Sequence, residues 1–154
     1  MRVFVGRVFV GQVFVGQVFV GIVLVLLSTS IPALAVGSSQ PYGKGGWFAQ
    51  FDPIVRQYNQ SGEQFRIEGH CQSACTLFLG IRNVCVVRSA RLLFHAGHDR
   101  QRNIRPSATN HLMSHYNARL RAYLIANRIM ETIAFTTISG SDMISKFGYR
   151  ECSG

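Results

Sequence analysis

The residues most suited to catalysis lie in one short segment, residues 69–75, with the sequence GHCQSAC. The pattern predicts a strand, a tight turn and a helix, with Ser73 at the turn. A serine there lies at a helix N-terminus, where free backbone N–H groups can hold a developing oxyanion. Ser73 is therefore a candidate nucleophile, with an ordinary helix cap as the alternative role for a lone serine.

A serine hydroxyl is a weak nucleophile and needs a base within hydrogen-bond reach. His95 follows the apolar segment Leu92–Phe94, which predicts a strand. A histidine at that strand end is the candidate base for Ser73. The alternative is a histidine whose hydrogen bonds are satisfied at the strand end.

Helical and strand patterns alternate along the chain around these residues. Apolar residues recur at helical spacing over Phe48–Tyr58, before a break at residues 61–62. Short strands are expected over residues 65–69 and 84–87, and a buried helix over residues 74–79. The sequence therefore predicts an α/β domain.

Several finer details concern the helices. The dipeptide Asp52-Pro53 fits only near the first turn of the first helix. Ser107 is expected to cap a later helix whose apolar face carries Leu112, Met113, Tyr116, Leu120 and Leu124. Trp47 and Phe48 are expected in the core, with a place in a substrate cleft as the alternative.

The N-terminal segment differs in composition from the rest of the chain. It begins with Arg2 and Arg7, continues with an apolar run and ends in Ala33-Leu34-Ala35. This layout predicts a secretory signal peptide over residues 1–35, followed by a single domain over residues 36–154. An uncleaved membrane anchor is the alternative, because the apolar run is long enough to cross a bilayer.

Length and charge limit the classes of function. The chain has 154 residues, a length that excludes a large multidomain enzyme. Its formal net charge is +9. Its basic residues are spread over a loop and a helix without a recognised motif, so we expect no nucleic-acid partner. Membrane contact is expected only through an uncleaved N-terminal segment.

The four cysteines all lie in the predicted exported part. An even number in an oxidising compartment favours disulfides. Three pairings are open, and we favour Cys75 with Cys85 and Cys71 with Cys152. A zinc site using His70, Cys71, Cys75 and His95 is the alternative, but its spacing fits no common site.

The remaining histidines are expected to be exposed polar residues. His95 and His98 could face one side of a loop, and His111 and His115 have the helical spacing that can bind a metal. Because neither a third ligand nor a following glutamate accompanies His111 and His115, no metal is expected.

Three segments in order along the chain resemble the Clp-protease and crotonase superfamily. Gly45-Gly46 resembles the oxyanion turn, residues 69–73 the nucleophile turn, and residues 89–95 the strand that delivers the base. The sequences CQSACT at residues 71–76 and LFHA at residues 93–96 resemble small exported Clp-like proteins of bacteria. The resemblance covers about residues 43–152 and implies a reduced Clp-protease/crotonase-like fold with alternating helices and short strands.

The resemblance also implies catalytic roles. Ser73 would be the nucleophile, and His95 the general base and later the acid. Backbone N–H groups of Gly46 and Ala74 would form the oxyanion hole of a reaction that passes through an acyl-enzyme without a cofactor.

The family also has a third catalytic group, an aspartate that orients the histidine. The aspartate that usually orients the histidine aligns near Phe135, which leaves Asp142 as the candidate. A residue that offsets the dipole at a helix start is the equal alternative for Asp142.

The expected function is therefore an exported serine hydrolase, a peptidase that acts on a peptide or protein substrate in the periplasm or outside the cell. A second copy of the chain could complete the fold, because the predicted domain begins only shortly before the Gly45-Gly46 turn. Two alternatives remain. One is a catalytically silent Clp-like binding or assembly protein of the cell envelope. The other is an envelope protein whose basic surface contacts anionic lipid or polymer.

Overall fold

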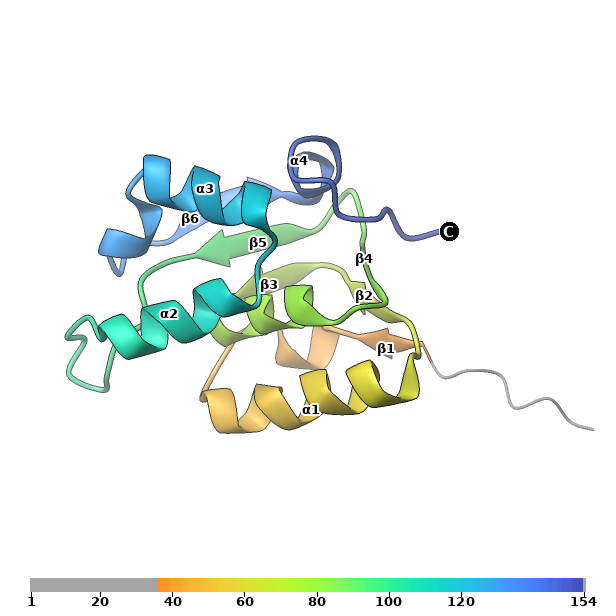
Figure 1. The fold of residues 1–154 in the computed structure, drawn as a ribbon, viewed down its shortest axis with the longest axis horizontal. Helices are drawn as coiled ribbons and strands as arrows, with labels where there is room; N and C mark the ends of the chain where they lie inside the picture. The colour runs from red at the N-terminus through yellow and green to blue at the C-terminus, as the bar shows by residue number, and fades with distance from the viewer. Residues whose placement is uncertain (1–35, 154) are drawn as a thin grey trace, which may run out of the picture. The chain divides into compact units, whose positions relative to one another are not determined.

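The computed structural model describes residues 36–153. The predicted signal peptide lies outside these residues. Within them, helices and short strands alternate in a mixed α/β arrangement, as the sequence predicts (Figure 1). None of the helices in this part of the chain is long and apolar enough to span a bilayer.

The strands form two small sheets. The first is parallel, in the order β1-β2-β4, and consists of β1 (Gly37–Ser38), β2 (Phe65–Ile67) and β4 (Val84–Val86). The second has β5 in its centre and consists of β3 (His70–Gln72), β5 (Arg91–Phe94) and β6 (Thr136–Ser139). In this sheet β3 runs parallel to β5, whereas β6 runs antiparallel to it.

Helices connect these strands. The α-helices are α1 (Phe48–Ser61), α2 (Pro106–Ser114), α3 (Ala118–Ala126) and α4 (Gly140–Ser145). Three 3-10 helices are η1 (Gln40–Tyr42), η2 (Ser73–Gly80) and η3 (Ile129–Glu131). Where the sequence predicts a buried helix after Ser73, the chain forms η2.

The first helix follows its prediction closely. It ends where the apolar spacing breaks, and Gly62 caps it with a φ of 73°, a left-handed conformation that glycine adopts without steric cost. Pro53 lies deeper inside α1 than the first-turn position that we expected.

The predicted helix with Leu112 and Leu124 on one face is in fact two helices. Pro106 occupies the first position of α2, so Arg105 rather than Ser107 is the N-cap residue. The break comes at Asn117, whose side-chain oxygen accepts the N–H of Leu120 at 3.0 Å. The same side chain donates to the carbonyl of Phe147 at 2.8 Å, which fixes the start of α3 against the C-terminal part of the chain.

The core is built around η2. Its residues 74–79 are all buried, and η2 contacts α1, α2 and strands of both sheets. The Phe78 ring lies 5.4 Å from the Phe51 ring of α1 and 4.4 Å from the Phe65 ring of β2, measured between centroids. Since η2 begins at Ser73, the candidate nucleophile is attached to a buried element of the core.

All four cysteines form disulfides, but our favoured pairing is wrong. The bonds join Cys71 to Cys75 and Cys85 to Cys152. Cys71 and Cys75 are brought together by the tight turn, whereas the C-terminal segment returns to β4, where the Cys152 N–H donates to the Val86 carbonyl at 3.1 Å. The alternative zinc site therefore lacks its two thiolates, and the oxidised cysteines fit an oxidising extracytoplasmic compartment.

Candidate functional site

Ser73 sits on a strained turn between β3 and η2. Its φ of 53° is positive, a conformation that costs a non-glycine residue roughly 1–3 kcal/mol. The Cys71–Cys75 disulfide spans this turn, and the Thr76 hydroxyl donates to the Ser73 carbonyl at 2.7 Å. A serine held on a sharp strand-to-helix turn is the arrangement in which hydrolases expose a nucleophile.

The strand register brings His95 to the same edge of the sheet. Gln72 pairs with Leu93 across the parallel strands β3 and β5, so the C-terminal ends of both strands lie side by side. Ser73 follows the first strand, and His95 comes two residues after Leu93 on the second. Neighbouring strands are about 4.8 Å apart, which puts both residues in one neighbourhood.

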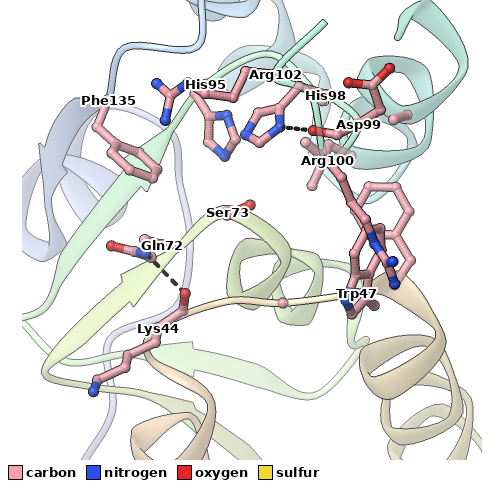
Figure 2. A pocket seen from close by; sticks show the side chains of 15 residues that line it. Lys44, Trp47, Gln72, Ser73, His95, His98, Asp99, Arg100, Arg102 and Phe135 are labelled. Atoms are coloured by element: carbon pink, nitrogen blue, oxygen red, sulfur yellow. Dashed lines mark hydrogen bonds between the residues drawn. The ribbon is translucent and has the colours of Figure 1, made fainter. Parts of the chain in front are cut away.

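Both side chains line one pocket of about 640 Å³ (Figure 2). The lining also includes Gly46, Phe48, Trp47, Leu112 and Phe135. In Figure 2 the His95 imidazole lies across the pocket from Ser73. Neither ring nitrogen of His95 has a hydrogen-bond partner among residues 36–153, so the two residues share the pocket without a hydrogen bond between them.

His95 is buried, with only 4% of its surface exposed. Phe135 packs its ring edge-on at 4.7 Å between centroids, and the His98 ring lies 5.3 Å away. Burial lowers the pKa of His95, and the neighbouring His98 lowers it further. Both effects favour the neutral imidazole, which is the form that can accept a proton.

The glycine turn predicted to hold the oxyanion packs against the Ser73 turn. Gly45 has a φ of 69°, and a Cβ atom there would lie 2.6 Å from the Gln72 carbonyl oxygen and 3.0 Å from the Ser73 Cβ. Only glycine permits this approach. Gly46 lines the pocket, and Ala74 follows Ser73 in the first turn of η2, where backbone N–H groups lack acceptors within the helix.

Asp142 is not part of this arrangement. Ser139 pairs with Arg91 at the start of β5, whereas His95 follows the other end of that strand, so Asp142 in α4 lies at the far end. Its carboxylate contacts the Lys146 ammonium at 3.0 Å, and the hydrogen bond from Lys146 is the main reason why its pKa is lowered. Asp142 is thus placed as a helix-start residue.

The position beside His95 is taken by an aromatic ring instead. Because Phe94 pairs with Thr136 in the antiparallel ladder, Phe135 falls opposite His95. The carboxylate in the pocket lining is that of Asp99, which is 2.7 Å from the Arg105 guanidinium. A hydrogen bond from the backbone N–H of Asn103 is the main cause of its lowered pKa. The Asp99 carboxylate therefore binds groups of its own loop.

The pocket rim combines aromatic and cationic side chains. Trp47 is 55% exposed, so its expected place in the core is wrong, and the Arg100 guanidinium lies 5.1 Å from the centre of its indole ring. Lys44 and Arg102 also line the pocket. Sequence reasoning missed these cations because the loop that carries two of them reaches Trp47 only through the tertiary fold.

No protein-family model matches this chain, and no curated protein sequence matches it.

Proposed function

We propose that this protein is an exported serine hydrolase that cleaves peptides with Ser73 as nucleophile and His95 as base. The single observation that carries the proposal is the parallel register of β3 and β5, which places a strained serine and a buried neutral imidazole on one pocket. The reaction requires the Ser73 hydroxyl to come within hydrogen-bond distance of a His95 nitrogen, and the two form no hydrogen bond in this conformation.

The proposed reaction uses these residues as follows. Ser73 Oγ forms a bond to the carbonyl carbon of the substrate while its proton passes to His95. The backbone N–H groups of Gly46 and Ala74 donate to the resulting oxyanion, each worth about 3 kcal/mol in the transition state. His95 then gives its proton to the leaving amine as the C–N bond breaks, and water hydrolyses the acyl-enzyme by the same route.

The pocket lining supports a substrate that is both apolar and anionic. Phe48, Leu112 and Phe135 offer apolar surface, whereas Lys44, Arg100 and Arg102 offer positive charge. A peptide with an apolar side chain beside the cleaved bond and an acidic group nearby matches this combination.

A fluorophosphonate probe tests the proposal, because it reacts with activated serine hydroxyls. We expect the folded, oxidised protein to form an adduct on Ser73 and the Ser73→Ala variant to form none. His95→Gln should slow labelling by about 100-fold or more, since a general base contributes about 10²–10⁴-fold. Intact protein that stays unlabelled at Ser73 would rule out the hydrolase.

One observation favours a second candidate function. No carboxylate stands beside His95 in the part of the chain that the structure describes, and Phe135 fills that place. A protein that keeps the fold and the pocket but binds peptides without cleaving them would have this composition. It would bind acidic peptides with equal affinity in the wild type and in Ser73→Ala, and would give no adduct.

The proposal includes export to the periplasm or the medium, supported by the two disulfides. The proposed leader is residues 1–35. N-terminal sequencing of the protein from cell fractions tests this, with Val36 as the expected first residue and an intact N-terminus in the membrane fraction as the contrary result.

A further inference from the structure

A second group of polar side chains lies outside the reaction just described. His111 and His115 belong to α2 and its C-cap, and the fold places Asp52 of α1 against them. The His111 Nε2 is 2.9 Å from the Asp52 Oδ1. One donor atom from each of the three residues lies within 4.8 Å of the other two.

We propose that Asp52, His111 and His115 bind a divalent transition-metal ion, represented by zinc, and that the ion ties α1 to α2. Two imidazoles and one carboxylate form a donor set that zinc accepts, with water in the fourth position. The third ligand that the sequence lacked near His111 comes from a residue 59 positions earlier in the chain.

The distances fit a site that is nearly formed. Bonds of about 2.0–2.2 Å around a tetrahedral zinc ion separate neighbouring ligand atoms by about 3.3 Å. The contact between Asp52 and His111, at 2.9 Å, is close to this value, and the donor atom of His115, within 4.8 Å of both, would move closer on binding. A metal ion would replace the Nε2 proton that His111 donates to Asp52, leaving the proton of the neutral ring on Nδ1.

His115 has a backbone partner that fixes its tautomer, as metal-binding histidines do. Its Nδ1 is 3.1 Å from the Leu77 carbonyl oxygen, and because a carbonyl can only accept, Nδ1 carries the proton. The lone pair is therefore on Nε2, and a backbone carbonyl is a usual outer-shell partner of a ligating imidazole. A Cβ at Gly80 would lie 2.5 Å from His115 Nδ1, so the glycine lets the ring seat against η2.

The site adjoins the pocket without being part of it. Phe48 of α1 lines the pocket and contacts the His111 ring at 4.6 Å between centroids. Leu112, the neighbour of His111, is also in the lining. A bound ion would thus fix the two helices that form one wall of the pocket. The inference does not depend on Ser73 or on hydrolysis.

Calorimetric titration with zinc chloride tests the site, using the oxidised protein as the cell processes it and without a histidine tag. We expect one zinc ion per chain. Asp52→Asn and His115→Gln should each weaken binding by more than about 100-fold, beyond the 10–100-fold typical of outer-shell changes. His98→Gln, which changes a pocket imidazole, is the matched control and should bind like the wild type.

Asp52→Asn is the more telling variant, because its amide oxygen can still accept from His111 while the charge is lost. Imidazole ¹⁵N spectra of the wild type give a second measurement that needs no variant. Zinc should shift the resonances of His111 and His115 and leave those of His98. Absence of saturable binding, unchanged affinity in both ligand variants, or shifts at His98 in place of His115 would overturn the proposal.

Discussion

At the scale of single residues, the surroundings of His95 decide its chemistry. Its two ring nitrogens are buried without a partner in the described chain, with one aromatic ring and a second imidazole beside them. Such an environment disfavours the charged ring and keeps a lone pair available. Two measurable consequences follow, one for stability and one for the proton affinity of the ring.

Stability should fall in acid because of His95. Its folded-state pKa lies below the ordinary value, so the unfolded chain takes up a proton first as the pH drops below about 6.5. Above that pH the free energy of unfolding keeps its full contribution from the neutral ring. As the pH falls from about 6.5 to the folded-state pKa, this contribution is lost at no more than about 1.4 kcal/mol per pH unit. Urea unfolding at several pH values should show a smaller loss for His95→Gln than for the wild type. Equal losses in the two proteins would contradict this assignment. His115, whose pKa is also lowered by burial, is present in both.

Replacing Phe135 tests what the missing carboxylate would do. In Phe135→Asp, a negative charge would stand beside His95, and a charge at such a distance moves a pKa by about 1–3 units. Histidine NMR titration should show a raised pKa for His95. The neutral variant Phe135→Asn is the control, and it should give a smaller rise than the aspartate.

At the scale of elements, the sequence patterns predicted correctly the helices and strands that depend on local spacing. The apolar spacing of α1 and the short apolar runs at β4 and β5 gave helix and strands at the right positions, and His95 does follow β5. The break at Asn117 was missed because its second partner, Phe147, lies 30 residues away.

The sequence could place Ser73, His95 and the Gly45-Gly46 turn, but not the other groups around His95. The strand β6 carries no strong signal, so its antiparallel pairing, which puts Phe135 beside His95 and Asp142 at the far end, was not predicted. Disulfide pairing likewise depends on where the C-terminal segment returns, which no local pattern encodes.

The short disulfide between Cys71 and Cys75 should matter more for the site than for stability. Its sequence separation is only 4, and a loop of that size contributes about 2 kcal/mol by loop closure. We expect the Cys71→Ala/Cys75→Ala double variant to remain folded but to relax the positive φ of Ser73. Fluorophosphonate labelling should slow in this variant. Labelling at the wild-type rate would show that η2 holds the turn without the bond.

At the scale of the whole described domain, the second disulfide connects the middle of the chain to its C-terminal segment. The Cys85–Cys152 bond joins β4 to the C-terminal segment, which is also held by the ion pair between Arg88 and Glu151. The ion pair is largely exposed and contributes little by itself. The covalent bond adds to the backbone hydrogen bonds that join this segment to Val86 of β4.

Removing this bond should cost more stability than removing the short one. The sequence separation is 67, for which loop closure gives about 4 kcal/mol. Urea unfolding of Cys85→Ala/Cys152→Ala should show a lower midpoint than that of Cys71→Ala/Cys75→Ala, whereas its fluorophosphonate labelling should be less affected. If the midpoints came in the reverse order, strain in the folded protein or residual structure in the unfolded chain would contribute more than loop length to the stabilisation by each disulfide.

The same bond encloses β5, β6 and α2 to α4 within a single covalent ring. The exposed arginines at 100 and 102 are natural cleavage points for trypsin-like proteases. A backbone cut among them would open the ring without releasing a fragment. The nicked molecule would migrate as one species until a reducing agent separated it into two, so damage to the arginine loop need not dismantle the protein.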